Sequence, residues 1–419
     1  MNTLEIISVL VATAALFGWL SSRVLRVPIT IGTMLLTVLT TLSLAGIGRL
    51  APGLHGWAKQ LAGSIDFESL VMHGMLPLLL FAGAFLLDLE HLAREKVPVA
   101  VLSVLGTILS VFAVAGLMLL ISGTGATWME CLIFGALISP TDPIAVLELL
   151  RRIGIPKSLE AQLAGESLFN DGIGAVLFIT MIEIARGDAP TPGHIAGLLL
   201  LKAGGAVVLG ILGAWLVSRL MCLAEAYQVE ILLTLALALG GYVLADLWRL
   251  SAPLEAVVAG IALRHFNRRQ AKGRIADERV DEFWTLLDEV QNSVLFVLLG
   301  LEAMAVRLNA STVRAGLAAI FSVSLVRLAV VALCLAIVRM CQKQFRSSVK
   351  TLTWGGLRGG LSIALALSVP KTLGQTQTGA WIFGATYMIV VFSIILQGGS
   401  LQFALARKQR RAGAQVHSS

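Results

Sequence analysis

The stretch GESLFNDG, residues 165–172, places two carboxylates and a carboxamide inside a run that is otherwise apolar. On a helix, Glu166 lies one turn before Asn170, and Ser167 lies one turn before Asp171, so the two pairs form neighbouring stripes. Carboxylate, amide and hydroxyl oxygens are the ligands that a hard cation prefers. The stretch therefore predicts a cation site, with Asp171 as a carboxylate for which a proton would compete.

A second stretch, LISPTDPIAVLELL, interrupts another apolar run. Pro143 has no N–H to offer the carbonyl of Ser139, and Pro140 breaks the hydrogen-bond ladder in the same way one turn earlier. Free carbonyls at membrane depth are tolerated only where protein or a water-filled cavity satisfies them. Thr141 and Asp142 lie between the prolines, so we predict a functional helix break here rather than a simple kink.

A third stretch, TWGGLRGGLSIALALS, carries Arg358 between two pairs of glycines. A charge there is expensive in a membrane unless it has a partner. Glycines permit unwound backbone as well as close helix packing. We predict a second broken helix at Arg358; a tight packing face is the alternative.

Glu166 needs a partner of its own, because an unpaired buried ion costs several kcal/mol. The arginines inside apolar runs are Arg327 and Arg358. We predict a structural ion pair between Glu166 and Arg327, with Arg358 as the second choice. Asp171 is then the carboxylate that is left to exchange its charge.

The elements that must position these residues are membrane helices. The chain has 419 residues, of which 57% are hydrophobic and 14% charged, and its mean hydropathy is +0.86. A soluble chain of this length could not bury so much apolar surface. Apolar runs long enough to cross a bilayer predict an all-α polytopic protein of about thirteen spans. We place them near 5–21, 28–48, 69–88, 97–121, 129–149, 160–185, 195–218, 230–246, 252–265, 284–305, 313–340, 350–370 and 378–404.

The basic residues set the orientation. The loops after odd-numbered spans and the tail hold 22 of the 32 Lys and Arg residues, whereas the loops after even-numbered spans hold 7. Cytoplasmic loops carry this excess, so we predict an external N-terminus and an internal C-terminus. The net charge of +7 comes from the same loops and suits anionic lipid headgroups rather than nucleic acid. Residues 1–21 lack the basic start and the cleavage site of a signal peptide.

The two predicted breaks lie in spans 5 and 12, seven spans apart. An odd offset gives two six-span repeats opposite orientations, with span 7 between them. Inverted repeats with crossed broken helices are typical of secondary transporters, which bind their substrate near the midplane.

Taken together, ISPTDPIAV, GESLFNDG, QNSVLFVLLGLE and WGGLRGGLSIALALS resemble the cation:proton antiporter-1 family of sodium/proton exchangers, close to the prokaryotic NhaP type. The resemblance covers the membrane part of the chain, residues 1–404. It implies a homodimer in which a mobile core moves against a dimerisation part. The implied dimerisation part is about 1–90 and 226–306, the core about 97–185 and 313–404, the linking helix about 195–218, and the basic cytoplasmic tail 405–419.

The resemblance also implies residue roles. Asp171 would bind the ion and the proton, Asn170 would be its pair-mate, and Na⁺ would be held by Asp171, Ser167 and the Thr141 backbone. Asp142 and Arg358 would neutralise the ends of the broken helices, and Glu166 with Arg327 would form the core ion pair. One departure concerns Ala82, which stands where many relatives carry an acidic residue in span 3. The cation preference, Na⁺ or K⁺, therefore stays open.

We expect a secondary antiporter in the plasma (inner) membrane of a prokaryote that exchanges Na⁺, and also Li⁺, for H⁺. The resemblance and the Asn170–Asp171 pair predict electroneutral one-for-one exchange with elevator-like core movement and a role in pH and sodium homeostasis. Alternatives are a K⁺/H⁺ antiporter, a sodium-coupled organic-solute symporter and a channel. An aspartyl protease using Asp142 and Asp171 lacks its expected Gly-x-Gly-Asp signature.

The remaining residues suggest no resident cofactor, since the four cysteines are isolated and without metal-ligand spacing. Glu255 has no assigned role. We expect it either to line the vestibule between the two parts or to reach the external surface.

Overall fold

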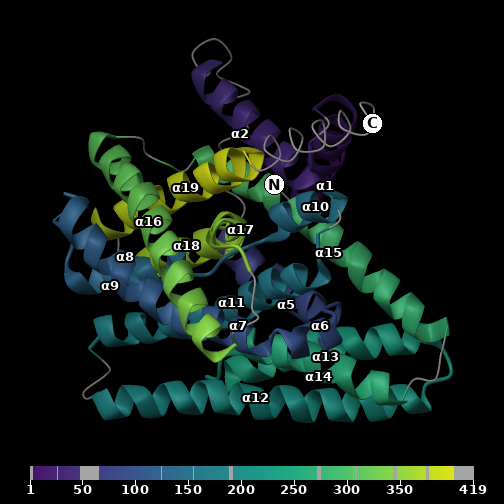
Figure 1. Ribbon diagram of the computed structural model, residues 1–419. Coiled ribbons are helices and arrows are strands. Elements are labelled where there is room, and N and C mark those ends of the chain that lie inside the picture. Colours follow the sequence, from purple (N-terminus) through teal and green to yellow (C-terminus); the bar gives the residue numbers. More distant parts are fainter. Residues whose placement is uncertain are drawn as a thin grey trace, which may run out of the picture.

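The computed structural model is helical, and the residues that it describes contain no β-strand (Figure 1). It describes residues 3–25, 27–47, 66–123, 125–153, 155–187, 192–270, 275–304, 306, 309–342, 347–373 and 377–400. The predicted tail, residues 405–419, lies outside them.

The helices follow the predicted apolar runs. In the first half of the chain they are α1 (Thr3–Leu20), η1 (Ser21–Leu25), α2 (Ile29–Ile47), α4 (Phe67–Ser69), η2 (Leu70–Met75), α5 (Leu76–Phe85), α6 (Leu89–Arg94), α7 (Lys96–Ala100), η3 (Val101–Gly106), α8 (Thr107–Ile121), α9 (Trp128–Ile138), α10 (Ile144–Ile153) and α11 (Lys157–Ala185). In the second half they are α12 (Pro192–Leu223), α13 (Tyr227–Leu247), α14 (Ala252–Gln270), α15 (Ile275–Leu301), η4 (Glu302–Met304), α16 (Ala310–Cys341), α17 (Val349–Gly355), α18 (Gly360–Leu373), α19 (Gln377–Val391) and η5 (Phe392–Gly398).

Within the described residues, eight helical segments are long and apolar enough to cross a membrane. They are Leu4–Leu25, Phe67–Phe85, Lys96–Ile121, Lys157–Ala185, Leu200–Leu223, Tyr227–Leu247, Ala310–Cys341 and Trp381–Gly398. Three shorter apolar helical segments, Ile29–Ser43, Trp128–Ile138 and Gly360–Val369, accompany them. The last two belong to the predicted broken helices.

Two helices extend beyond the apolar runs that predicted them. α15 begins at Ile275, ahead of the expected start at residue 284, and α14 continues past residue 265 to Gln270. The guanidinium of Arg264 pairs with both carboxylate oxygens of Asp281, at 2.6 and 2.9 Å, and so ties the charged ends of these helices together. Hydropathy marks the apolar part of a helix and not its end.

Two groups of helices flank the breaks. α12 runs along the lower edge of Figure 1 with α13 and α14 above it, whereas α8, α9, α16 and α19 lie in its upper left half. The first group packs on a cluster that includes Phe81 and Trp284, whose ring centroids are 4.7 Å apart. Gly260 of α14 lies so close to α5 that a Cβ there would be 2.8 Å from the carbonyl oxygen of Phe81. This glycine brings the two backbones into contact.

Both predicted breaks are present, between Ile138 and Ile144 and between Gly355 and Gly360. They cross, because the Asp142 N–H donates to the Leu357 carbonyl at 2.8 Å, in an isolated antiparallel bridge. α11 passes beside the crossing, where Gly174 leaves room for the Pro140 ring. The fold thus brings all three polar stretches of the sequence to one place.

Candidate ion-binding site

The first break ends α9 with carbonyl groups that have no helical donor. The Arg358 guanidinium, which is buried, donates through Nη1 to the carbonyl oxygens of Ser139 at 2.8 Å and Pro140 at 2.9 Å. A positive charge at this end also complements the partial negative charge of a helix C-terminus. Arg358 from the second break therefore satisfies the first.

Asp142 lies at the start of the other half-helix. Its carboxylate accepts from the Ile144 N–H at 2.9 Å, so it caps the N-terminus of α10. Its other face packs on Gly359, where a Cβ would run into the carboxylate. The side chain is thereby held against the second break.

Thr141, between the prolines, is held by two residues of α11. Asn170 accepts from the Thr141 N–H at 3.2 Å and donates to the Thr141 hydroxyl at 2.7 Å. The Ser167 hydroxyl donates to the Thr141 carbonyl. All three residues are buried. The extended backbone of the break is therefore bound to α11 through its donor, its acceptor and its side chain.

Asp171 differs from Asp142, Asn170 and Arg358 in that its side chain has no direct partner within the described part of the chain. Its side chain is partly exposed, and among the described residues its carboxylate has neither a hydrogen bond nor an ion pair. Asp142 and Arg358 act on it electrostatically, with opposite signs. Asp171 thus presents an uncommitted carboxylate directly after Asn170 and one turn after Ser167, the two residues that bond Thr141. The oxygens of Thr141 and Ser167 each have a second lone pair for a cation.

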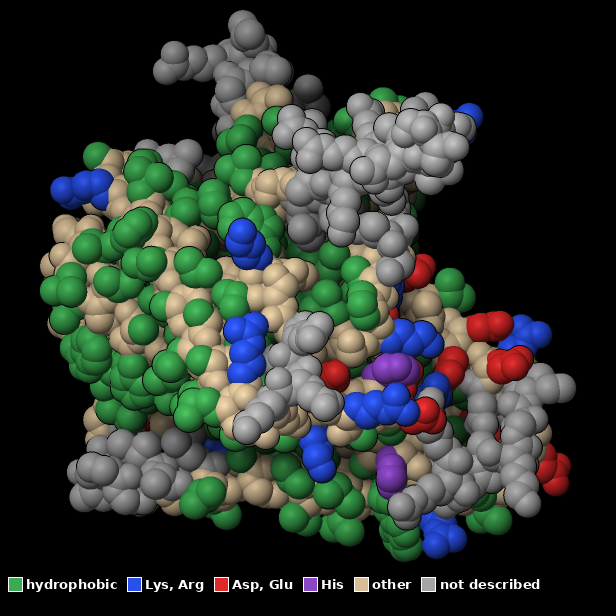
Figure 2. All heavy atoms as spheres, viewed as in Figure 1, with side chains coloured by type: hydrophobic (Ala, Val, Ile, Leu, Met, Phe, Trp, Pro, Cys, Tyr) green, Lys and Arg blue, Asp and Glu red, His purple; other side chains and the backbone are tan. Residues whose placement is uncertain are grey.

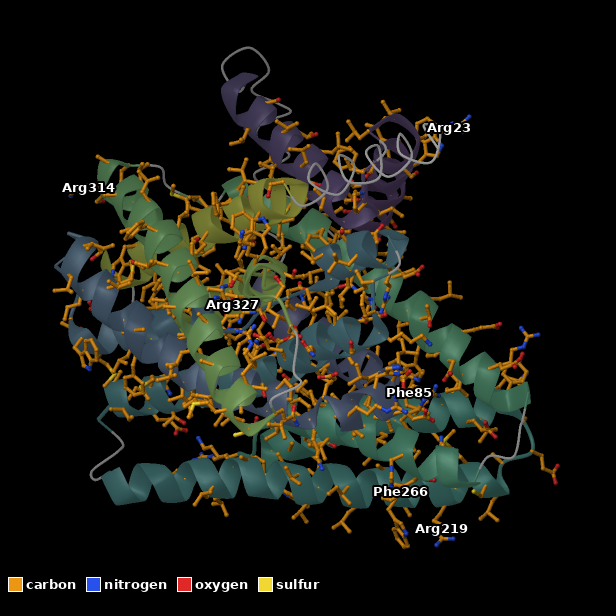
Figure 3. The ribbon with its side chains drawn as sticks, viewed as in Figure 1. Arg23, Phe85, Arg219, Phe266, Arg314 and Arg327 are labelled. Carbon is orange, nitrogen blue, oxygen red and sulfur yellow. The ribbon has the colours of Figure 1, made fainter. Side chains whose placement is uncertain are left out.

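Glu166 is ion-paired with Arg327 of α16, and both side chains are buried. The same guanidinium donates to the Leu352 carbonyl at 2.9 Å, near the end of α17. It lies directly on Gly356, where a Cβ would be 2.6 Å from Nη2. Figure 3 shows Arg327 in the middle of the molecule, whereas Arg23, Arg219 and Arg314 lie at its periphery. Of the two candidate partners for Glu166, Arg327 and Arg358, the structure pairs Glu166 with Arg327.

The structure adds two sets of contacts that the sequence did not predict, one at the second break and one between α12 and α11. The Arg358 N–H donates to the Ser393 hydroxyl at 3.1 Å, and Ser393 donates to Gln397, which ties the second break to η5. Lys202 donates to both carboxylate oxygens of Glu183, at 2.7 and 2.8 Å, and joins α12 to α11. Ser393 and Gln397 are one turn apart in an apolar run, a signal that could have marked them. The Lys202–Glu183 ion pair had no such local signal, because its two residues lie on different helices.

Comparison with known proteins identifies the family. The family model described as "Sodium/hydrogen exchanger, transmembrane" matches residues 11–407, nearly the whole chain. The chain belongs to the sodium/hydrogen exchanger family. The Na(+)/H(+) antiporter NhaP of Pseudomonas aeruginosa is 38% identical over 407 residues, 95% of each chain. The Na(+)/H(+) antiporter NhaH of Halobacillus dabanensis is 29% identical and covers 84% of this chain and 86% of its own.

The fold agrees with this membership. The solved structure of the sodium proton antiporter MjNhaP1 from Methanocaldococcus jannaschii superposes with a TM-score of 0.76 at 19% identity. The match covers 97% of this exchanger and 99% of that chain. With its relatives and its apolar helices, this exchanger is a multi-pass protein of the plasma membrane.

Proposed function

We propose that this protein exchanges Na⁺ for H⁺ and that the two compete for the carboxylate of Asp171. The observation that carries the proposal is the uncommitted state of Asp171 at a crossing where the surrounding polar residues have partners. A cation bound there would take oxygens from Asp171, Ser167 and the Thr141 backbone. Li⁺ would use the same oxygens.

Competition for one carboxylate explains coupled exchange. Bound Na⁺ or H⁺ neutralises Asp171, whereas the empty, ionised carboxylate resists movement through the low-dielectric interior. Only the loaded site would cross, which gives one-for-one exchange. Asn170 cannot take up a second proton, so one H⁺ exchanges for one Na⁺, both crossing forms carry the same net charge, and exchange is electroneutral. Such exchange would serve pH and sodium homeostasis.

The proposed movement is an elevator-like shift of a core against a dimerisation part. The core would comprise residues about 97–185 and 313–404, the dimerisation part about 1–90 and 226–306, and the link about 195–218. The bonds of Glu166, Asn170 and Arg358 join segments that all lie within the proposed core. They would keep the site intact while the core moves. A homodimer would anchor the other part.

We further propose thirteen membrane crossings with the N-terminus outside and the C-terminus inside. In Figure 2, hydrophobic side chains cover the upper left of the face shown, and most Lys, Arg, Asp and Glu side chains gather toward its lower right. The basic excess in the loops after odd-numbered spans supports the same orientation.

The test is proton flux in everted vesicles energised to an acid interior, with NaCl, LiCl or KCl added separately. Dequenching by Na⁺ and Li⁺ but not by K⁺ is the expected result, and it would mean that Ala82 does not prevent Na⁺ binding. A response to K⁺ alone would keep antiport but change the cation. No response to any cation at mildly acidic, neutral or alkaline pH would contradict antiport and favour the symporter.

A further inference from the structure

Glu255 in the first turn of α14 is a buried carboxylate that the proposed exchange does not use. Its side chain is 0% exposed, and neither carboxylate oxygen has a hydrogen-bond partner among the described residues. The expectation that it lines a vestibule or reaches the external surface is therefore wrong. Hydropathy cannot reveal such burial, because Glu255 lies close to the start of its apolar run.

Glycines of two neighbouring helices lie against Glu255. Gly241 of α13 lies against it so closely that a Cβ there would overlap the carboxylate. Gly210 of α12 lies against the backbone of the same turn, where a Cβ would be 3.0 Å from the Glu255 main-chain carbonyl oxygen. An ionised carboxylate without partners is strongly disfavoured at such a place, so the neutral acid is the stable form.

No neighbouring charge compensates Glu255 within the described residues. α5 has no titratable side chain. On the other helices packed around α14, the groups nearest its first turns have other partners or face outward. They are Lys202 (paired with Glu183), Tyr242 (its hydroxyl donates to the Met72 carbonyl), Asp246 (exposed), Glu166 (paired with Arg327) and Asp171 (at the helix crossing).

The position of α14 connects Glu255 with the ion-binding helix. Leu254, the preceding residue, packs on Gly172 of α11, where a Cβ would be 3.4 Å from Leu254 Cδ1. Gly172 directly follows Asp171. A shift at the start of α14 would therefore move Leu254 relative to Gly172, directly beside the proposed ion-binding carboxylate of Asp171.

We propose that Glu255 is a second proton-binding site, distinct from Asp171. Its proton is not transported. While Glu255 is protonated and neutral, α14 stays packed against α13. Loss of this proton at alkaline pH leaves an unpaired buried charge. The start of α14 then loosens from Gly241 and from Gly172. Since the proposed function has α11 move past α14, exchange becomes faster when Glu255 is ionised; this effect alone rests on the proposed function.

Infrared difference spectroscopy of the full chain in lipid vesicles tests the proton directly. After a step from neutral to alkaline pH, the wild type should lose a protonated-carboxyl C=O band. Glu255→Gln should lack this band, whereas Asp171→Asn and the exposed control Glu289→Gln should keep it. An unchanged spectrum in Glu255→Gln would overturn the proposal. The Asp171→Asn spectrum separates it from the proposed function, because that variant is expected not to exchange.

The pH profile of exchange gives the second readout. Glu255→Gln imitates the protonated acid, so it should match the wild type at the acid end and lose the alkaline rise in rate. The Glu255 side chain is 0% exposed and lies against Gly241. The methyl group of Gly241→Ala would occupy the place of the carboxyl group, so this variant should shift or remove the Glu255 band. A band that is unaffected by Gly241→Ala, or an alkaline rise that survives in Glu255→Gln, would contradict the proposed role.

Discussion

Glu166 and Asp171 lie less than two turns apart on α11, yet the tertiary structure treats them in opposite ways. Glu166 is buried and ion-paired with Arg327, which also bonds to the backbone of α17. Asp171 is partly exposed and has no partner among the described residues. The difference teaches that a carboxylate between apolar helices is structural when an arginine pairs with it, and is open to exchange when it has no direct partner and is partly exposed.

Asp171→Asn should have the largest effect on function. The amide cannot release a proton or offer a charge to Na⁺, so we expect exchange to be abolished while the protein still folds. Exchange in proteoliposomes and thermal unfolding in detergent measure the two properties, with the exposed Asp246→Asn as the matched control. Exchange that persists in Asp171→Asn would exclude this carboxylate as the coupling site.

Glu166→Gln, unlike Asp171→Asn, should lower the stability of the protein. It leaves Arg327 as an uncompensated buried charge, and breaking such a pair costs about 3–5 kcal/mol. We expect a marked loss of thermal stability and, with it, of exchange. The double variant Glu166→Gln, Arg327→Met removes both charges and should regain much of that stability. If Glu166→Gln is as stable as the wild type, the pair has no structural role.

Arg358→Met tests the compensation of the breaks. The Ser139 and Pro140 carbonyls lose their donor, and each buried orphan group costs about 1–3 kcal/mol. We expect destabilisation comparable to that of Glu166→Gln, together with slower exchange. Unfolding in detergent would show it, and a variant as stable as the wild type would mean that water replaces the guanidinium.

Asn170→Asp should still exchange Na⁺ for H⁺, but its rate should depend on the membrane potential. A second carboxylate beside Asp171 would take up a second proton in the H⁺-loaded form and be ionised in the Na⁺-loaded form. Two H⁺ would then exchange for one Na⁺, so each turnover moves one net charge and an imposed membrane potential of the favourable sign should accelerate the variant. The wild type should be nearly insensitive to the same potential. Strong acceleration of the wild type in proteoliposomes would contradict electroneutral exchange.

Ser167→Ala should have the smallest effect. It removes one proposed Na⁺ ligand and the hydroxyl that bonds the Thr141 carbonyl. A single hydrogen bond or ligand contact is worth about 1 kcal/mol, which corresponds to about a five-fold rise in the KM for Na⁺. An unchanged KM would remove Ser167 from the ligand set.

Much of this site could be predicted because its signals are local. Two prolines around Thr141 and Asp142, and two glycine pairs around Arg358, predict helix breaks through the rules of backbone hydrogen bonding. The apolar runs likewise predict where the helices lie. The ends of α14 and α15 could not be predicted in this way, because hydropathy does not distinguish a charged helix end from a loop.

The sequence by itself determined which groups needed partners: the freed carbonyl of Ser139, the carboxylates of α11 and the guanidinium of Arg358. Only the tertiary structure decided who the partners are, since hydrogen bonds and ion pairs depend on distances between residues far apart in the chain. It selected Arg327 for Glu166 and, within the part of the chain that it describes, left Asp171 and Glu255 without a direct partner. Whether a carboxylate has a partner is a property of the packed molecule, because it depends on which side chains the neighbouring helices bring within bonding distance.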